Sequence, residues 1–185
     1  GVFNMGEDDE RFDSTPAHRV HITKEFWMMQ TEVTQGLYNS LQRKNPSRLK
    51  RDDHPVENVS WIDAVYFANA LSVYSGLEEC YDTSAVPEVT WPKGLDCQGY
   101  RLPTEAEWEY SARANQSFKY AGSDNVDEVA WYYRNSGRQT HPVGQKKSNC
   151  FGLYDMSGNV FEWVWDRRGD YSSGSQTDPT GPDSV

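Results

Sequence analysis

The sequence lacks any apolar run long enough to cross a membrane, and it opens without the charged, apolar-cored segment of a secretion signal. It also lacks an excess of positive charge, because its formal net charge is −10 at pH 7 and no basic stripe offsets this. Phosphate backbones repel such a chain, so nucleic acid is not expected as a partner. We therefore expect a mature or trimmed segment with no membrane-spanning part.

Cysteine is scarce, with three residues in 185. Cys80 and Cys97 bracket a loop rich in turn residues, and we expect a disulfide between them. Such a bridge would stabilise the fold by roughly 3 kcal/mol in the chain-entropy model and would imply an oxidising compartment. The alternative is a pair of free thiols. No histidine or basic residue flanks Cys150 to lower its pKa, so we expect a small buried hydrophobe rather than a nucleophile.

Several catalytic signatures are missing as well. No Gly-x-Ser-x-Gly elbow occurs, which gives no support for an α/β-hydrolase nucleophile. His18 and His21 lie three residues apart on an expected strand, so their side chains point to opposite faces and do not share a metal easily. His54 and His141 each precede a proline, and we expect both to be hydrogen-bonded structural residues.

Aromatic residues, by contrast, are plentiful. They make up 14% of the chain, including seven Trp and eleven Tyr, and the hydrophobic fraction is 36%. Large flat side chains can fill the space between irregular segments, so this composition predicts a loop-rich fold with a sizeable core. The length and the absence of internal repeats predict one domain over residues 1–185.

Capping signals and periodicity predict three helices among short strands. Helices are expected after the N-cap residues Thr34, Ser60 and Thr104, the last two with an acidic residue three positions later. Apolar residues recur at helical spacing from Trp61 to Leu71, and Gly76 is the expected C-terminal stop. Strands are expected at residues 2–5, 19–22 and 26–30, with shorter candidates at 129–133 and 140–143.

Two short clusters have both a functional and a structural interpretation. Residues 131–134, with sequence WYYR, form an aromatic-cationic group that could stack on a sugar or a peptide, or could simply pack loops against the core. Residues 166–170 contain two Asp and two Arg, and we interpret them as a solvated charge run.

The segment 151–163, with sequence FGLYDMSGNVFEW, combines aromatics, glycines and carboxylates in one compact stretch. Asp155 and Glu162 can supply anionic oxygens, and Gly158 lets the backbone bend until carbonyl oxygens point inward. Calcium prefers such an all-oxygen arrangement, although the spacing does not fit an EF-hand. A second interpretation makes Asp155 a turn former and Glu162 a strand-end carboxylate. The residues alone leave both open.

Several motifs, in this order and spacing, resemble the formylglycine-generating enzyme family, also called sulfatase-modifying factors. The most specific are residues 101–110 (RLPTEAEWEY), 140–144 (THPVG) and 152–163 (GLYDMSGNVFEW). Earlier motifs at residues 5–6, 16–18, 31–34 and 54–61 extend the resemblance over nearly the whole chain.

The resemblance implies an α+β, C-type-lectin-like fold, with two helices beside small antiparallel sheets and much irregular structure stabilised by calcium. It also implies metal ligands in the 151–163 segment. Asp155 and Glu162 match the family's side-chain ligands for calcium, and Gly158 and Val160 match its backbone carbonyl ligands. The family's other calcium site has no convincing acidic match within residues 129–144.

The expected activity departs from that of the family. Its enzymes oxidise a sulfatase cysteine to formylglycine with molecular oxygen, through two cysteines in a C-terminal segment that bind copper in some members. Neither Cys80, Cys97 nor Cys150 matches that pair, so we assign no catalytic residue, and copper is expected only if such a pair exists outside this chain. The chain is expected to lack the family's C-terminal strands, which a C-terminal fragment or a second chain would then complete.

Three functions remain open from the sequence. The first is a non-catalytic, calcium-stabilised binding or scaffold module with a protein or carbohydrate ligand. The second is a fragment of a formylglycine-forming oxidase, and the third is a lectin-fold protein that displays a variable ligand-binding surface. An extracellular, periplasmic or cell-surface location is expected for the binding module.

Overall fold

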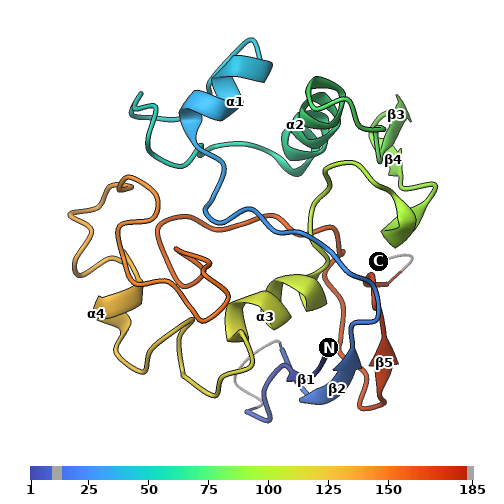
Figure 1. Cartoon of the computed structure of the whole chain (residues 1–185), viewed down its shortest axis with the longest axis vertical. Helices are drawn as coiled ribbons and strands as arrows, with labels where there is room; N and C mark the ends of the chain where they lie inside the picture. Colours follow the sequence, from blue (N-terminus) through green and yellow to red (C-terminus); the bar gives the residue numbers. More distant parts are fainter. Residues whose placement is uncertain (10–13, 183–185) are drawn as a thin grey trace.

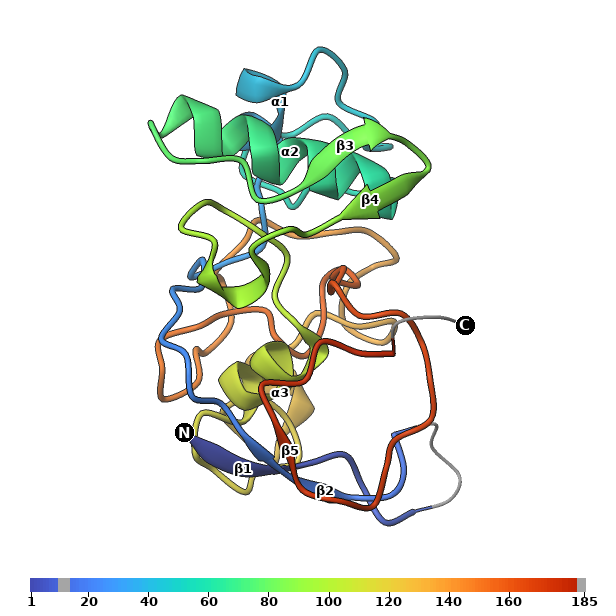
Figure 2. The ribbon, with the colours of Figure 1, turned by 90° about the vertical axis from the view of Figure 1, so that its right-hand side faces the viewer.

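A computed structural model describes residues 1–9 and 14–182. A small sheet and a pair of helices lie at opposite ends of the long axis, with a third helix between them and long irregular segments around it (Figures 1 and 2). The expected α+β class is confirmed, because few residues belong to regular elements and both helices and strands are present.

The main sheet has three strands in the order β1–β2–β5. Strand β1 (Val2–Met5) pairs antiparallel with β2 (His18–His21), and β2 pairs with β5 (Gln176–Thr177) in parallel. A second, antiparallel pair joins β3 (Asp82–Ala85) to β4 (Glu88–Thr90). The β1–β2 and β3–β4 pairs are antiparallel, as expected, and the short β2–β5 pair adds a parallel edge that the sequence did not indicate.

The three expected helices are confirmed at their predicted caps. They are α1 (Gln35–Leu41), α2 (Trp61–Tyr74) and α3 (Glu105–Arg113). Two shorter helical turns also form, η1 (Gly94–Asp96) before α3 and α4 (Val126–Val129) after it. The hydroxyl oxygens of Thr34, Ser60 and Thr104 each accept a hydrogen bond from the backbone N–H three residues later. Each cap satisfies a donor that the helix itself cannot pair.

The expected disulfide joins Cys80 to Cys97, and both residues are buried against α2. An aromatic group packs on the same cluster, in which Trp165 stacks on Tyr81 with ring centroids 5.1 Å apart. The bridge and this aromatic group hold the β3–β4 region against α2. Here aromatic side chains fill the space between irregular segments, as the composition predicted.

Cys150 is exposed, which corrects the expectation of a buried thiol. Its neighbour Asn149 is buried instead, and the Asn149 Nδ2 atom donates to the carbonyl oxygens of Ser111 and Ala112 at 2.7 and 3.2 Å. Because this amide satisfies the end of α3, the adjacent cysteine is turned outward.

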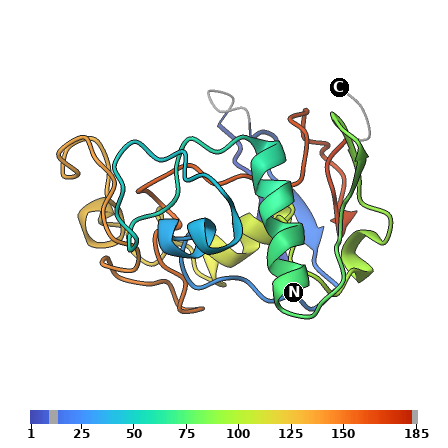
Figure 3. The same ribbon diagram turned by 90° about the horizontal axis from the view of Figure 1, so that it is seen from above.

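The strands expected at 26–30, 129–133 and 140–143 do not form. Residues 26–30 belong to no strand. Tyr154 N–H donates to Gln30 O at 2.9 Å, but one such hydrogen bond does not make a strand pair. Val129 ends α4, and Val143 N–H donates once, to Asp53 O at 3.0 Å. The apolar residues of these segments pack loops together and do not line a sheet. Seen from above, the three segments, apart from Val129, are drawn as coil (Figure 3).

Among the helices of residues 1–9 and 14–182, none combines the length and the apolar character that crossing a bilayer requires.

Candidate functional site: a carboxylate-lined turn

The 155–162 turn is pressed against the loop that follows α4. Asp155 and Asn159 both have positive φ values, of 60° and 64°, a conformation that asparagine and aspartate tolerate better than most residues. A Cβ atom on Gly158 would lie 2.5 Å from Trp131 O, closer than any real contact. The motif's glycine is therefore required by close backbone packing, and it fixes the depth of the turn.

Asp155 is buried, with 3% of its surface exposed. Its Oδ2 atom accepts a hydrogen bond from Gly144 N–H at 2.7 Å, whereas its Oδ1 atom has no hydrogen-bond partner. Burial raises the pKa of this carboxyl group, and the Gly144 N–H only partly opposes that shift. A buried acceptor without a partner carries a free-energy penalty of about 1–3 kcal/mol, which a bound cation would remove.

Glu162 approaches the same turn from the far end of the motif. Its Oε2 atom accepts a hydrogen bond from the Trp108 indole N–H on α3. Burial raises the pKa of Glu162, and the negative charge of Asp155 raises it further. Asp155 and Glu162, the two acidic ligands predicted from the sequence, are thus close enough for the charge of one to affect the pKa of the other, although they lie seven positions apart.

The predicted carbonyl ligands are also free to bind. In the hydrogen bonds among the described residues, no protein donor reaches the carbonyl oxygens of Gly158 or Val160. With the two carboxylates, they offer an all-oxygen donor set of the kind that calcium takes. The residues present therefore fit a calcium ion, and the orphaned Oδ1 of Asp155 is the clearest sign of this fit.

A third carboxylate, which the sequence did not predict for this site, lies beside the turn. Glu32 is 8% exposed, and its two oxygens accept hydrogen bonds from Asn159 Nδ2 at 2.9 Å and Val160 N–H at 3.2 Å. Burial, followed by the negative charges of Asp155 and Glu162, raises the pKa of Glu32 to about 9. Glu32 belongs to the 31–34 motif, but nothing in that motif's spacing marks a partner more than 120 residues away.

No set of three or more His, Cys, Asp or Glu side chains in residues 1–9 and 14–182 is arranged to hold a metal ion. A cation in the turn would therefore depend on main-chain oxygens as well as on Asp155 and Glu162. Glu32 would act as a neighbour that orients the turn, because both of its oxygens already accept hydrogen bonds.

The histidines have structural surroundings. His54 Nδ1 lies 3.1 Å from Thr140 Oγ1, and burial lowers the pKa of His54. The His141 ring stacks on Trp131 at 3.8 Å. His18 is buried in β2 while His21 is only partly buried. These contacts agree with the structural roles expected from the sequence.

The expected solvated charge run at 166–170 is wrong for Asp166. This carboxylate is partly buried and accepts a hydrogen bond from Glu105 N–H, 2.8 Å away at the start of α3. Burial raises its pKa to about 6, and the nearby Glu105 and Glu107 add to the shift. The two arginines next to Asp166 suggested an exposed charge run, and nothing in the sequence indicated the contact with Glu105, 61 residues away.

The surface formed by the described residues includes two clefts of about 500 Å³ each. The first lies between the loop that precedes α2 and the loop that follows α4, and it includes three of the four residues of the WYYR cluster. The second lies beside Trp61 and Trp165, near Pro182. The first cleft borders the carboxylate-lined turn, since Asn159 contributes to its wall.

Comparison with known proteins gives close relatives. The chain is 38% identical over 174 residues to the chaperone protein LppX of Paenibacillus barcinonensis, covering 77% of this chain and 62% of the chaperone. It is 36% identical over 128 residues to the formylglycine-generating enzyme of Mycobacterium tuberculosis, covering 62% of this chain and 34% of the enzyme. The chain thus spans less than two thirds of either relative.

Among solved structures, Treponema denticola variable protein 1 superposes with a TM-score of 0.86 at 32% identity, covering all of this chain and 77% of that one. This similarity confirms the expected α+β, C-type-lectin-like fold. The model of the sulfatase-modifying factor enzyme 1-like domain matches residues 1–178. From its sequence and its fold alike, this chain is a member of the sulfatase-modifying factor enzyme 1-like family.

Proposed function

We propose that this chain is a non-catalytic binding module of the family, stabilised by calcium in the 155–162 turn and working in an oxidising compartment outside the cytosol. The observation that carries the proposal is the buried Asp155 carboxylate, whose Oδ1 atom has no protein partner. Isolated buried carboxylates are rarely tolerated in proteins, and a divalent cation is the simplest complement.

Calcium would be held by the carboxylates of Asp155 and Glu162 and by the carbonyl oxygens of Gly158 and Val160. When bound, it supplies positive charge and no redox chemistry. The chain's own residues do the rest, because Glu32 holds the Asn159 side chain and the Val160 N–H and so shapes the turn. The ion's role is therefore to fix an irregular segment that no helix or sheet supports.

The cysteine inventory supports a non-catalytic role. Cys80 and Cys97 are joined in a buried disulfide, and Cys150 is exposed as a single thiol. Oxidation through two cooperating thiols has no matching pair among these residues. The disulfide favours an exported protein, and the names of two relatives, a chaperone and a variable protein, are in keeping with binding rather than catalysis.

The test is the melting temperature with excess calcium and with a chelator. At calcium one hundredfold above the dissociation constant, binding adds about 2.7 kcal/mol, or several degrees for a chain of this size. Asp155→Ala should abolish the calcium-dependent rise, whereas the matched Asp170→Ala, at an exposed position, should retain it. An unchanged melting temperature on chelation of the natural protein would refute the calcium site.

A second candidate is an oxidase that forms formylglycine, favoured by the 36% identity to the mycobacterial enzyme. It requires two further cysteines in the full gene product, with copper as their metal. The test is conversion of a sulfatase-derived cysteine peptide by that full product, followed by mass spectrometry. Absence of the two cysteines from the gene would remove this candidate.

A third candidate is a protein that displays a variable surface, favoured by the TM-score of 0.86 to the Treponema variable protein. Its test is genomic and simple. A near-repeat of the coding end downstream of the gene is expected for a diversifying protein, and a single unrepeated coding end would argue against it.

A further inference from the structure

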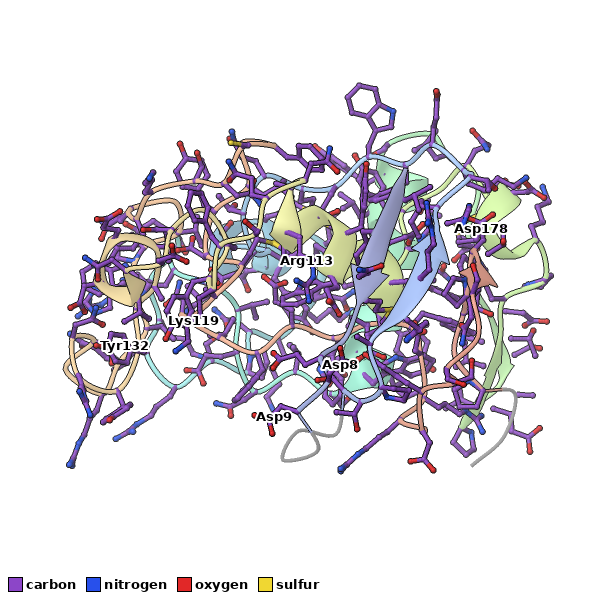
Figure 4. The ribbon with its side chains drawn as sticks, turned by 90° about the horizontal axis from the view of Figure 1, so that it is seen from below. Asp8, Asp9, Arg113, Lys119, Tyr132 and Asp178 are labelled. Atoms are coloured by element: carbon purple, nitrogen blue, oxygen red, sulfur yellow. A yellow bond between two sulfur atoms is a disulfide. The ribbon has the colours of Figure 1, made fainter. Side chains whose placement is uncertain are left out.

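The first cleft lies between two loops that are far apart in sequence. The loop before α2 and the loop after α4 lie side by side in two perpendicular views (Figures 1 and 3). Two backbone and side-chain contacts tie them together, Val143 N–H to Asp53 O at 3.0 Å and His54 Nδ1 to Thr140 Oγ1 at 3.1 Å. Tyr132 marks this end of the molecule, opposite Asp178 (Figure 4). The volume of about 500 Å³ is that of a small-molecule site.

The cleft is locally positive in a chain with a net charge of −10. Arg48 and Arg138 line it, and neither guanidinium has an ion-pair or hydrogen-bond partner among the described residues. The one acidic lining residue, Glu57, is already engaged, because its carboxylate accepts from Arg48 N–H at 2.7 Å and from Asn58 Nδ2 at 2.8 Å. Two forked, unpaired guanidinium groups are suited to a carboxylate, sulfate or phosphate group.

An exposed ring stands beside these charges. Tyr133 is 74% exposed although it lines the cleft, and the edge of the Tyr132 ring meets it at a centroid distance of 5.6 Å. Trp131, in contrast, is covered by the His141 ring at 3.8 Å and by the Lys146 ammonium at 4.0 Å. Trp131 therefore supports the loop. Tyr133 is the more exposed ring, but the Arg134 guanidinium lies 5.4 Å from its centroid and donates to its hydroxyl oxygen at 2.7 Å, so a ligand would use the face turned away from Arg134.

The loop that carries these groups is held in place by its own hydrogen bonds. Tyr132 N–H donates to Asn135 Oδ1 at 2.8 Å, and Ser136 N–H donates to Tyr132 O at 2.8 Å. His141 Nε2 lies 2.9 Å from Ser136 O, which closes the loop onto the stacked Trp131. A loop ordered in advance loses little conformational entropy when a ligand binds, so modest contacts suffice for affinity.

From this geometry we infer that the cleft binds an acidic saccharide, such as a short chain of uronic acids; this inference rests on the proposed binding role and names its ligand class. A sugar ring would stack on Tyr133, and its carboxylate would meet Arg48 and Arg138. A folded protein partner fits less well, because such interfaces centre on buried apolar anchors. This cleft is open, polar and without a deep apolar pocket.

The experiment is a calorimetric titration of the intact chain with trigalacturonic acid, alongside its neutral methyl ester. Binding of the acid should weaken at least tenfold in Arg138→Gln and in Arg48→Gln, and severalfold in Tyr133→Ala. Arg19→Gln is the matched control, because it removes the same charge from an exposed position on β2, at the sheet end of the molecule. Melting temperatures of all variants establish that each one is folded.

Tetraglutamate and inorganic phosphate are the competing probes. The inference holds if the acid binds at least tenfold more tightly than its ester and than both probes. It is overturned if the acid does not bind, if the arginine variants bind like Arg19→Gln, or if the ester or either probe binds as well as the acid. A failed chelator test with retained sugar binding would reject the calcium proposal alone, whereas a calcium-dependent melting temperature without sugar binding would reject this inference alone.

Discussion

Two buried acidic sites, at Glu107 and at Asp155, solve the same physical problem in different ways. Glu107 is 2% exposed and receives both Nη atoms of Arg101, at 2.6 and 2.8 Å, as well as Thr104 N–H at 2.9 Å. Asp155 is 3% exposed, yet it receives only Gly144 N–H and has two acidic neighbours, Glu32 and Glu162. Glu107 has a cationic partner in Arg101, whereas Asp155 has no ion pair among the residues that the structure describes.

This difference shows what kind of stability each site confers. The Arg101–Glu107 pair is present under all conditions in which both groups are charged, and it fixes the start of α3 permanently. The contribution of the Asp155 site varies with pH, because burial raises the pKa of its carboxyl group, and under the calcium proposal it varies with calcium as well. We therefore expect the start of α3 to stay fixed as conditions change, whereas the stability of the 155–162 turn should change with pH.

Removing the built-in cation should have the largest effect. Arg101→Met leaves Glu107 buried without its partner, and we expect a loss of about 3–5 kcal/mol in the free energy of unfolding, measured by urea denaturation. Lys24→Met breaks the exposed pair with Asp96, which water screens, and should change the free energy of unfolding far less. Equal losses in the two variants would contradict the importance of the Arg101 pair.

The calcium-free protein should become less stable as pH rises. Glu32 has its folded-state pKa raised from 4.5 to about 9, so its favourable contribution is complete below pH 4.5 and is lost progressively towards pH 9. The slope is at most about 1.4 kcal/mol per pH unit. Denaturation in chelator at pH 5 to 8 should show this decline, and calcium should reduce it. A chelated Glu32→Gln variant with the same slope would exclude Glu32 as its source.

Filling the close contact behind the turn should be moderately destabilising. In Gly158→Ala the new Cβ would lie 2.5 Å from Trp131 O, so the turn must shift, and we expect a loss of about 1–3 kcal/mol with weaker calcium binding. Gly174→Ala is the control, because nothing lies within 4 Å of its added Cβ. Thermal denaturation with and without calcium measures both effects, and equal behaviour of the two variants would contradict the packing argument.

The smallest effect is expected at Asp166, whose carboxylate is partly buried and accepts a hydrogen bond from Glu105 N–H. Its pKa is raised from 3.8 to about 6, so the natural protein loses stability as pH rises between these values. Asp166→Asn keeps an acceptor for Glu105 N–H and should be more stable by up to about 1 kcal/mol at pH 7, with no gain at pH 3.5. A gain that does not depend on pH would point to another cause.

Local chemistry made a large part of this molecule predictable. The caps at Thr34, Ser60 and Thr104 act within three residues, so the helix starts could be read from the sequence. The Cys80–Cys97 bridge followed from loop spacing. The four expected calcium ligands lie within eight residues of one another, and the structure brings the two acidic ones into electrostatic contact.

Long-range contacts could not be predicted in the same way. Glu32 reaches the turn across more than 120 residues, and Asp166 reaches α3 across 61. Neither contact has a periodic or spacing signal, because it arises only when irregular segments pack. The same reason explains the wrong strands at 129–133 and 140–143, where aromatic side chains pack loops instead of a sheet.

In the order β1–β2–β5, the first and the last strand of the described chain lie on either side of β2. Tyr132, which lines the first cleft, lies on the opposite side of the molecule from Asp178, the residue that follows β5 (Figure 4). The pairing of the first and last strands with β2 and the lining of the cleft are therefore carried by separate parts of the domain.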